Sequence, residues 1–375
     1  MRKILSYAAL LAAIVVVACS VDEELSSQAK VEDDGSIGFA TYLPKITKAT
    51  AITNDTFTET DFEVYGFFVD GEQIMGVEDL GVQFVATDGV WDYADADEKV
   101  YWSENEMDFL AISPAQSAED YVTVSAQNST ISLSYTVPTD NADQVDLLYA
   151  EIFGVSSTDR DGTGNNVSTG SVELDFAHLL TQITFDVSTL DESLDVVVSE
   201  IALCNIVQSG TYSIDISSGE GLWTLSDDSE QEEYGLGSEE SLMLIPQTLT
   251  PWETVVGTPV AIADTENAYI AISCTIYNEA TDTYIVGSED GDGIVYIPFG
   301  GTWSAGQSYN YSFIFGQSSV SDGGDGGESG NDSTGASGGG AGFDADGNPI
   351  LYDLVINFTP TISVDWVEQS GDATM

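Results

Sequence analysis

Short runs of alternating apolar and polar residues recur from Ile37 onward, and they constrain the fold more than any other feature of the chain. In the clearest examples, 131–137 and 309–315, every second residue is apolar or aromatic. This two-residue period is typical of a strand with one buried face, and Gly, Asn, Asp and Pro separate the runs. No long segment shows the 3.6-residue period of an amphipathic helix. The pattern predicts an all-β chain of the sandwich type.

The spacing of the strand-like runs also indicates how the chain is divided. Further strands are expected at 62–69, 99–103, 107–112, 121–124, 145–150, 172–176, 183–187, 196–206, 211–216, 241–245, 269–277 and 294–299. The Gly- and Asn-containing loop from Ser156 to Gly170 is the best candidate for a hinge between two domains. We therefore predict an N-terminal β-sandwich domain over 37–170 and a C-terminal one over 171–375.

The charge balance excludes several classes of function. The 375 residues include 64 acidic and seven basic residues, for a formal net charge of −57, and nothing after Arg160 is basic. Nucleic acid is excluded as a partner because phosphate binding needs clustered cations. The bias is typical of a soluble exported protein, and it also removes sites for proteases that cut after Lys or Arg.

The first 19 residues form a predicted targeting segment rather than part of the fold. Arg2 and Lys3 precede an apolar run of 15 residues, which is short for a membrane span and ends in small residues before Cys19. This arrangement resembles a bacterial lipobox, in which Cys19 is acylated (a palmitate-type anchor) and becomes the new N-terminus. An ordinary signal peptide with a chance Cys is the alternative. Residues 20–36 are polar and acidic, as expected of a tether to the cell outer membrane.

The end of the chain combines a Gly-rich segment with a strong strand signal. Residues 321–342 are rich in Gly, Ser and Asp, which predicts a flexible linker. A C-terminal strand is expected over 350–367, interrupted at Pro360. Its alternate residues would line one face; they are Ile350, Tyr352, Leu354, Ile356 and Phe358. This strand can fold back onto its own domain or pair with another subunit by strand addition.

No residue pattern predicts catalysis, a metal site or a cofactor. His178 is the only His and alternates with Phe176 and Leu180, so we expect a buried, hydrogen-bonded structural side chain. Carboxylates are too common for any pair to indicate a glycosidase. Acidic loops at 92–98, 288–293 and 344–349 could bind calcium, but the last has Pro349 where an EF-hand needs Gly, so a polar turn is the better interpretation.

Two cysteines remain after the targeting segment. Cys204 and Cys274 each lie in an apolar strand-like run. They could form a disulfide in an oxidising compartment or remain as buried free thiols.

Three runs together resemble the fimbrillin family, the Mfa-like type V pilin subunits of Bacteroides-type bacteria. Residues 174–185 resemble the family's Phe-x-His-x-Leu-x-x-Ile-x-Phe stretch, 146–150 its Asp-Leu-Leu segment, and 301–311 its Trp-x-x-Gly-x-x-Tyr-x-Tyr stretch. The resemblance implies two tandem transthyretin-like β-sandwich domains. It also implies partners, namely other fimbrial subunits in a head-to-tail polymer.

The resemblance further implies processing and strand exchange. Such pilins are cut by a trypsin-like protease in an early strand, and the C-terminal strand of a neighbour fills the opened groove. The matching region here is 37–49, and the family's Thr-Arg-Ala is present as Thr47-Lys48-Ala49. The expected processing residue is therefore Lys48 or Lys45, and an Arg-specific protease would cut neither.

The sequence thus favours a non-enzymatic structural subunit of a cell-surface fimbrium that serves cell adhesion. The alternative is a non-polymerising surface lipoprotein, either an adhesin or a tip or anchor subunit, that binds a host or glycan ligand.

Overall fold

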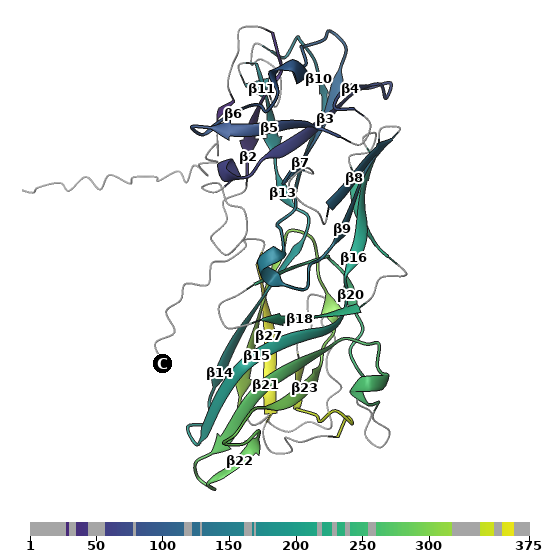
Figure 1. Ribbon diagram of the computed structural model, residues 1–375. Helices are drawn as coiled ribbons and strands as arrows, with labels where there is room; N and C mark the ends of the chain where they lie inside the picture. The colour runs from purple at the N-terminus through teal and green to yellow at the C-terminus, as the bar shows by residue number, and fades with distance from the viewer. Residues whose placement is uncertain are drawn as a thin grey trace, which may run out of the picture.

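A computed structural model describes the chain over residues 28–29, 35–43, 57–77, 80–115, 122–127, 130–160, 167–168, 170–215, 220–226, 231–236, 241–253, 260–316, 338–348 and 355–363. Within these ranges the chain forms strands, turns and short 3-10 helices, which confirms the all-β prediction. The helices are η1 (Phe57–Glu59), η2 (Ala96–Glu98), η4 (Asn141–Asp143) and η5 (Ile262–Asp264). Figure 1 shows an elongated molecule with strands gathered at an upper and a lower end. None of the helices in the described ranges is long and apolar enough to cross a membrane.

Two sheets form the upper end (Figure 1). The larger sheet has the order β1-β6-β5-β3-β7-β10-β13, with β4 paired to β3. Its strands are β1 (Gln28–Ala29), β3 (Phe62–Phe68), β4 (Gln73–Met75), β5 (Val82–Thr87), β6 (Val90–Tyr93), β7 (Met107–Ser113), β10 (Leu148–Val155) and β13 (Ala177–His178). The smaller sheet contains β11 (Val167–Ser168), β12 (Ser171–Asp175) and β2 (Gly38–Tyr42), and β2 runs parallel to β12.

Two further sheets form the lower end. One has the order β19-β14-β25-β27-β26, from strands β19 (Leu242–Leu244), β14 (Thr181–Thr189), β25 (Ser308–Phe315), β27 (Val355–Ser363) and β26 (Gly338–Ala341). The other has the order β18-β15-β21-β22, with β23 also paired to β21. Its strands are β18 (Gln231–Leu236), β15 (Leu194–Val207), β21 (Tyr269–Asn278), β22 (Thr283–Val286) and β23 (Gly293–Pro298). A small pair joins β20 (Thr248–Leu249) to β24 (Gly301–Thr302).

A four-stranded sheet connects the two ends along one side of the molecule (Figure 1). It contains β8 (Val122–Gln127) and β9 (Thr130–Thr136) from the first half of the chain, and β16 (Ser209–Asp215) and β17 (Glu220–Leu225) from the second. The halves meet where β9 pairs antiparallel with β16, from Thr130 opposite Asp215 to Thr136 opposite Ser209. Sheet pairing therefore crosses the predicted boundary at residue 170, as it also does between β2 and β12. The division into two tandem domains stays a prediction.

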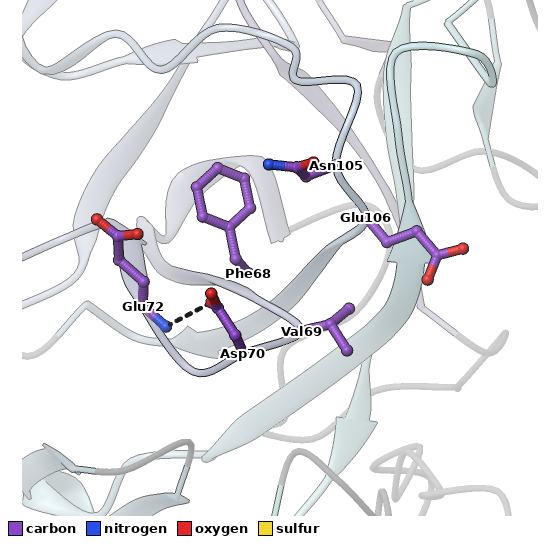
Figure 2. Close-up of a pocket in the computed structure, with 6 residues that line it drawn as sticks. All are labelled: Phe68, Val69, Asp70, Glu72, Asn105 and Glu106. Atoms are coloured by element: carbon purple, nitrogen blue, oxygen red, sulfur yellow. Dashed lines mark hydrogen bonds between the residues drawn. The ribbon is translucent and has the colours of Figure 1, made fainter.

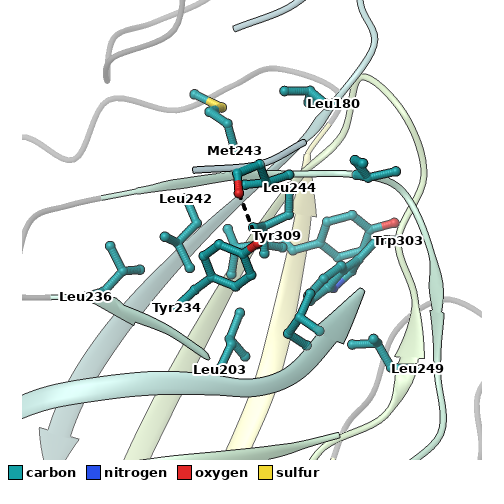
Figure 3. Close-up of a cluster of buried hydrophobic side chains, with 14 of the residues drawn as sticks. Leu180, Leu203, Tyr234, Leu236, Leu242, Met243, Leu244, Leu249, Trp303 and Tyr309 are labelled. Atoms are coloured by element: carbon teal, nitrogen blue, oxygen red, sulfur yellow. Dashed lines mark hydrogen bonds between the residues drawn. The ribbon is translucent and has the colours of Figure 1, made fainter. Parts of the chain in front are cut away.

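Alternation along the strands builds the hydrophobic cores. In β25, Tyr309, Tyr311, Phe313 and Phe315 are all buried and point into the core of the lower end, as the period of two predicts. Figure 3 shows part of this core, where Leu203 of β15 and Tyr234 of β18 converge with Trp303, the residue after β24. The same cluster continues upward to Leu133 and Leu110, so it extends past the connecting sheet.

Several local expectations from the sequence were wrong. The run 99–103 forms no strand and contributes only an isolated bridge between Tyr101 and Ser36. Strands β5 and β6, β17, β18 and β22 were not anticipated, because short runs interrupted by acidic or small residues give weak alternation. Part of the predicted linker, Gly338–Ala341, is strand β26. Residues 321–337 of that linker lie outside the described residues.

Candidate functional site: the first and last strands

Strand β2 is an integral part of the upper core. Ile37, Phe39 and Leu43 are each at most 3% exposed. The ring of Phe39 makes edge-to-face contacts with Phe84 at 5.0 Å and Phe109 at 5.4 Å between centroids. Such aromatic pairs stabilise the fold by roughly 0.5–1.5 kcal/mol in addition to the hydrophobic contribution of their buried surface. The alternation of this short strand therefore places its apolar face against the larger upper sheet.

Hydrogen bonds also hold β2 in place. The Trp91 indole Nε1 donates to Thr41 Oγ1 at 2.9 Å, and the Tyr93 hydroxyl donates to the Ile37 carbonyl at 2.7 Å. On its other side β2 pairs with β12 along its whole length, from Gly38 opposite Ser171 to Tyr42 opposite Asp175. Loss of β2 would remove both of these hydrogen bonds, and a buried donor that is left unsatisfied costs about 1–3 kcal/mol.

The predicted processing residues lie next to this strand in the chain. Lys45 and Lys48 fall in the segment 44–56, outside the described residues, and so does the predicted lipidation residue Cys19. The described chain stops at Leu43, directly after β2, and resumes at Phe57, the first residue of η1. A cut within 44–56 would therefore separate β2 from all later strands.

Strand β27 occupies the position of the predicted C-terminal strand. It pairs antiparallel with β25 from Ser363 opposite Ser308 to Ile356 opposite Phe315, and Phe358 lies opposite Phe313. On its other side β26 covers only the stretch from Val355 to Phe358. Of the predicted donor-strand residues, Ile356 and Phe358 are in β27, whereas Ile350, Tyr352 and Leu354 lie outside the described residues.

The predicted interruption at Pro360 was wrong. β27 continues through Pro360, which lies opposite Tyr311 of β25. Since β26 ends opposite Phe358, β27 has a described neighbour on one side only at Pro360. Proline has no backbone N–H to donate to a second neighbouring strand. A sheet therefore tolerates it where the strand has a neighbour on one side only.

The two remaining cysteines lie on opposite faces of the β15–β21 sheet. Cys204 packs in a cluster with Ala202, Trp252 and Tyr269, whereas Cys274 packs in the lower core. Both are free thiols. Burial raises the pKa of each to about 12, with Glu233 adding to the shift at Cys204 and Asp292 at Cys274. The disulfide alternative is therefore ruled out in this fold, and neither thiol is a plausible nucleophile.

The motif residues that suggested the family are structural. Trp303 Nε1 donates to the Tyr311 hydroxyl at 2.9 Å, so the two aromatic residues of one motif bind each other in the core. His178 is buried and its Nδ1 lies 2.9 Å from Asp146 Oδ1, which confirms the structural role expected for this side chain. That contact joins the other two motifs.

A shallow pocket of about 370 Å³ lies at the turn after β3 (Figure 2). Its lining combines the apolar side chains of Phe68 and Val69 with polar ones, namely Asp70, Glu72, Asn105 and Glu106. Asp70 is engaged locally, because its Oδ1 accepts a hydrogen bond from the Glu72 backbone N–H at 3.3 Å. The pocket contains no pairing of a nucleophile with a base, so its geometry gives no chemical step.

The acidic loops considered for calcium are built as turns. Asp95 Oδ1 accepts the Asp97 N–H and caps η2, and Asp344 Oδ1 accepts the N–H groups of Asp346 and Asn348. These hydrogen bonds hold the pKa of Asp344 below its usual value. Among the described residues, no group of three His, Cys, Asp or Glu side chains is arranged to hold a metal ion.

One set of contacts was missed by the sequence reasoning. Phe343, just after β26, packs with Trp252 on the outer face of the β15–β21 sheet. Burial of this second face could have been predicted from residues 201–206, because they are nearly all apolar and do not alternate strictly with polar residues. Such runs indicate a strand that is buried on both faces.

Comparison with known proteins assigns the chain to a family through one family model. The family model described as fimbrillin-like matches residues 47–330, most of the chain. A fimbrial protein from Bacteroides vulgatus is similar in structure, with a TM-score of 0.47, 16% identity, and coverage of 68% of this chain and 87% of that one. The fimbrial anchor protein Mfa2 from Porphyromonas gingivalis has a TM-score of 0.30 and 10% identity, covering 75% of this chain and 92% of its own. The search of curated proteins finds no match. On the match to the family model, the chain belongs to the fimbrillin-like family.

Proposed function

We propose that this chain is a structural subunit of a cell-surface fimbrium that polymerises by exchange of its C-terminal strand and serves cell adhesion. Membership of the fimbrillin-like family supports the fimbrial role. In this proposal Cys19 carries the lipid that anchors the exported precursor to the outer membrane. Cleavage at Lys45 or Lys48 then frees the subunit to join others.

The observation that carries the proposal is the placement of strand β2. β2 lies between β12 and the apolar face of the upper sheet, yet it is joined to all later strands only through residues 44–56, which contain Lys45 and Lys48. Removing β2 would expose the rings of Phe84 and Phe109 and the backbone edge of β12. An alternating strand from another copy satisfies both the apolar surface and the backbone groups.

The geometry also suits an open-ended polymer. The slot of β2 is in the upper end, and β27 is in the lower end (Figure 1). A contact between two different surfaces of identical subunits is heterologous, and it produces a filament unless the rotation closes a ring. Strand donation from the lower end of one copy to the upper end of the next has this form.

The test is the size of purified residues 20–375 by light scattering before and after limited trypsin. We expect cleavage within 44–56 to produce large oligomers. A chain ending at Ala341 should be cut but stay monomeric, and the Lys45→Gln/Lys48→Gln double variant should be neither cut there nor polymerised. If residues 20–375 are cleaved within 44–56, keep their C-terminus and still remain monomeric, strand exchange is contradicted.

A second candidate is a non-polymerising surface lipoprotein, an adhesin or a tip or anchor subunit. One observation favours it, namely that β27 is paired within its own sheet, between β25 and β26. That pairing is the arrangement expected if the C-terminal strand is never donated. The light-scattering experiment separates the candidates, because only the first predicts oligomers that need residues 342–375.

A further inference from the structure

One face of the connecting sheet is built largely from small hydroxyl side chains. Along β9 and β16, Leu133, Tyr135 and Ile214 are buried in the core cluster that extends past this sheet. Because side chains alternate along a strand, the residues between them face outward. The outward residues of β9, β16 and β17 lie in two rows, and β8 continues both rows in register. The first row is Thr123, Ser134, Thr211 and Thr224, and the second is Ser125, Ser132, Ser213 and Leu222. We call these two rows the hydroxyl face.

The hydroxyl face is accessible and self-complementary. Two cross-strand hydroxyl pairs lie within hydrogen-bond distance, namely Ser134 with Thr211 at 3.0 Å and Ser132 with Ser213 at 3.3 Å. Ser134 and Thr224 are exposed, and Leu222 is 71% exposed. A hydroxyl can both donate and accept a hydrogen bond. The face can therefore form hydrogen bonds with an identical face, and Leu222 gives it one apolar contact point.

The opposite side of the sheet holds this face in place. The rings of Tyr212 and Trp223 pack on the core cluster, with their centroids 5.5 Å apart. Trp223 Nε1 also donates to the Leu179 carbonyl at 2.8 Å. A surface fixed in this way loses little conformational entropy on binding. Sites for small ligands are concave and lined largely by apolar and aromatic side chains. The described aromatic rings of this sheet instead lie on its core side, so the hydroxyl face suits a protein surface better than a sugar.

The connecting sheet also differs from the other large sheets in charge. Its four strands contain no charged residue except Asp215 and Glu220, which lie opposite each other at the end of the β16–β17 hairpin. Carboxylates are distributed along the strands of the larger upper sheet and of the β15–β21 sheet; they include Glu63, Asp92, Glu151, Asp195 and Glu200. Two copies with a net charge of −57 repel each other where such carboxylates meet, and the centres of protein interfaces are depleted in charge. The hydroxyl face is therefore a surface through which two copies can approach.

The position of the connecting sheet leaves this face available in a polymer. The sheet lies along one side of the molecule, between the upper and lower ends (Figure 1). The strand exchange proposed above uses β2 in the upper end and β27 in the lower end, so it does not cover this side. Four strands about 4.8 Å apart and about 20 Å long present roughly 400 Å², whereas a stable interface takes about 800 Å² from each partner. A single contact through this face is therefore weak, and it gains strength where many copies are held in a row.

We propose that the hydroxyl face binds the hydroxyl face of a second copy of this chain, side by side. The contact is isologous, because the same residues meet on both copies. It needs neither cleavage nor strand exchange, so it is a property of the single subunit. Its role rests on the proposed function: in a polymer of strand-exchanged subunits, the repeated contact holds neighbouring filaments together.

The test is static light scattering of uncleaved residues 20–375, from which the second virial coefficient is obtained. At about 0.5 M NaCl the Debye length falls to about 4 Å, so repulsion between the acidic copies is screened. We expect a negative coefficient, which means net attraction, for the native chain. Ser134→Glu/Thr224→Glu places two charges on the hydroxyl face, and it should make the coefficient positive.

The matched control places the same two charges at the exposed turn before β22. Ala280→Glu/Thr283→Glu also removes one hydroxyl pair, because Thr283 Oγ1 lies 2.8 Å from Thr281 Oγ1. Its coefficient should stay negative. A second pair of variants disturbs the fold less, because both positions are exposed leucines: Leu222 is 71% exposed and Leu190, after β14, is 63% exposed. Leu222→Glu should abolish the attraction, whereas Leu190→Glu should retain it.

The outcomes are distinct. The proposal is overturned if the native chain shows no attraction in high salt, or if the hydroxyl-face variants and their controls give equal coefficients. Dextran that binds to the native chain but not to Leu222→Glu, in the absence of self-attraction, would assign the face to a neutral glycan instead and overturn the proposal. Attraction without oligomers after trypsin would retain the hydroxyl face and remove strand exchange. Oligomers after trypsin together with equal coefficients would do the opposite.

Discussion

The Nδ1 of His178 lies 2.9 Å from Oδ1 of Asp146, and both side chains are buried. Because a carboxylate only accepts, the Nδ1–H of His178 is the donor. His178 is in β13 and pairs with Leu148 of β10, two residues after Asp146. The contact therefore joins two sequence motifs at the lower edge of the upper sheet, just before the chain enters β14. Nearby, Trp223 Nε1 donates to the Leu179 carbonyl at 2.8 Å and ties the connecting sheet to the same point.

Replacing Asp146 should weaken the fold at this junction. Asp146→Ala removes the acceptor of a buried imidazole N–H, and we expect a loss of about 1–3 kcal/mol in the free energy of unfolding. Asp146→Asn retains an acceptor oxygen and should lose less. Urea unfolding followed by tryptophan fluorescence measures both. If Asp146→Ala and Asp146→Asn lower the free energy of unfolding equally, the hydrogen bond to His178 does not contribute to stability.

The cysteines should be chemically silent in the folded protein. Since burial raises the pKa of Cys204 and Cys274 to about 12, almost no thiolate forms at pH 8. Iodoacetamide should leave residues 20–375 unmodified in the native state and alkylate both thiols in concentrated urea, as measured by intact mass. A native mass lower by two hydrogens would instead reveal a disulfide and contradict the placement on opposite sheet faces.

Gly66 should not tolerate a side chain. A Cβ at this position would lie 2.8 Å from Met75 Cβ and 2.9 Å from Phe109 Cε1, inside the upper core. We expect Gly66→Ala to cost about 1–3 kcal/mol because core side chains must shift. Gly291→Ala is the matched control, since a Cβ there meets nothing within 4 Å. Thermal unfolding of the two variants should differ clearly, and equal midpoints would contradict the packing at β3 and β7.

Asp108 should make stability depend on pH. Its Oδ1 accepts the Gly154 N–H at 2.9 Å, but burial, with Glu106 adding to it, raises the pKa of the carboxyl above 3.8. A raised folded-state pKa means that the protonated form is favoured in the fold. The contribution of Asp108 to the free energy of unfolding is therefore complete at pH values below its unfolded-state pKa. It is lost as pH rises through its folded-state pKa.

Asp108→Asn tests this directly, because the amide can still accept from Gly154 but does not ionise. We expect the melting temperature of the variant to rise relative to the native chain as pH increases from 4 to neutrality. A constant difference across this range would mean that ionisation of Asp108 costs the fold nothing. Asp191→Asn is a contrasting variant, since hydrogen bonds from Ser193 lower the pKa of the Asp191 carboxyl instead of raising it.

The site was predictable from the sequence only in part. The C-terminal strand was expected from its alternation, and β27 is the described part of it. The importance of the region around 37–43 came from the family resemblance, and the burial of β2 gives it a physical basis. The continuation through Pro360 and the role of Phe343 were missed, because both depend on which neighbour lies beside the residue in the folded sheet.

What the sequence determined by itself is the class of structure. Alternation in runs such as 131–137 and 309–315 allows one buried face per strand, so an all-β fold follows from local chemistry. Only the tertiary structure decided which strands pair. β9 joins β16 across the two halves, and β2 runs parallel to β12. The same long-range pairing put Cys204 and Cys274 on opposite faces and brought Phe343 onto Trp252. The physical reason is that alternation specifies which side of a strand is buried, whereas the partner depends on packing between residues that are far apart in the chain.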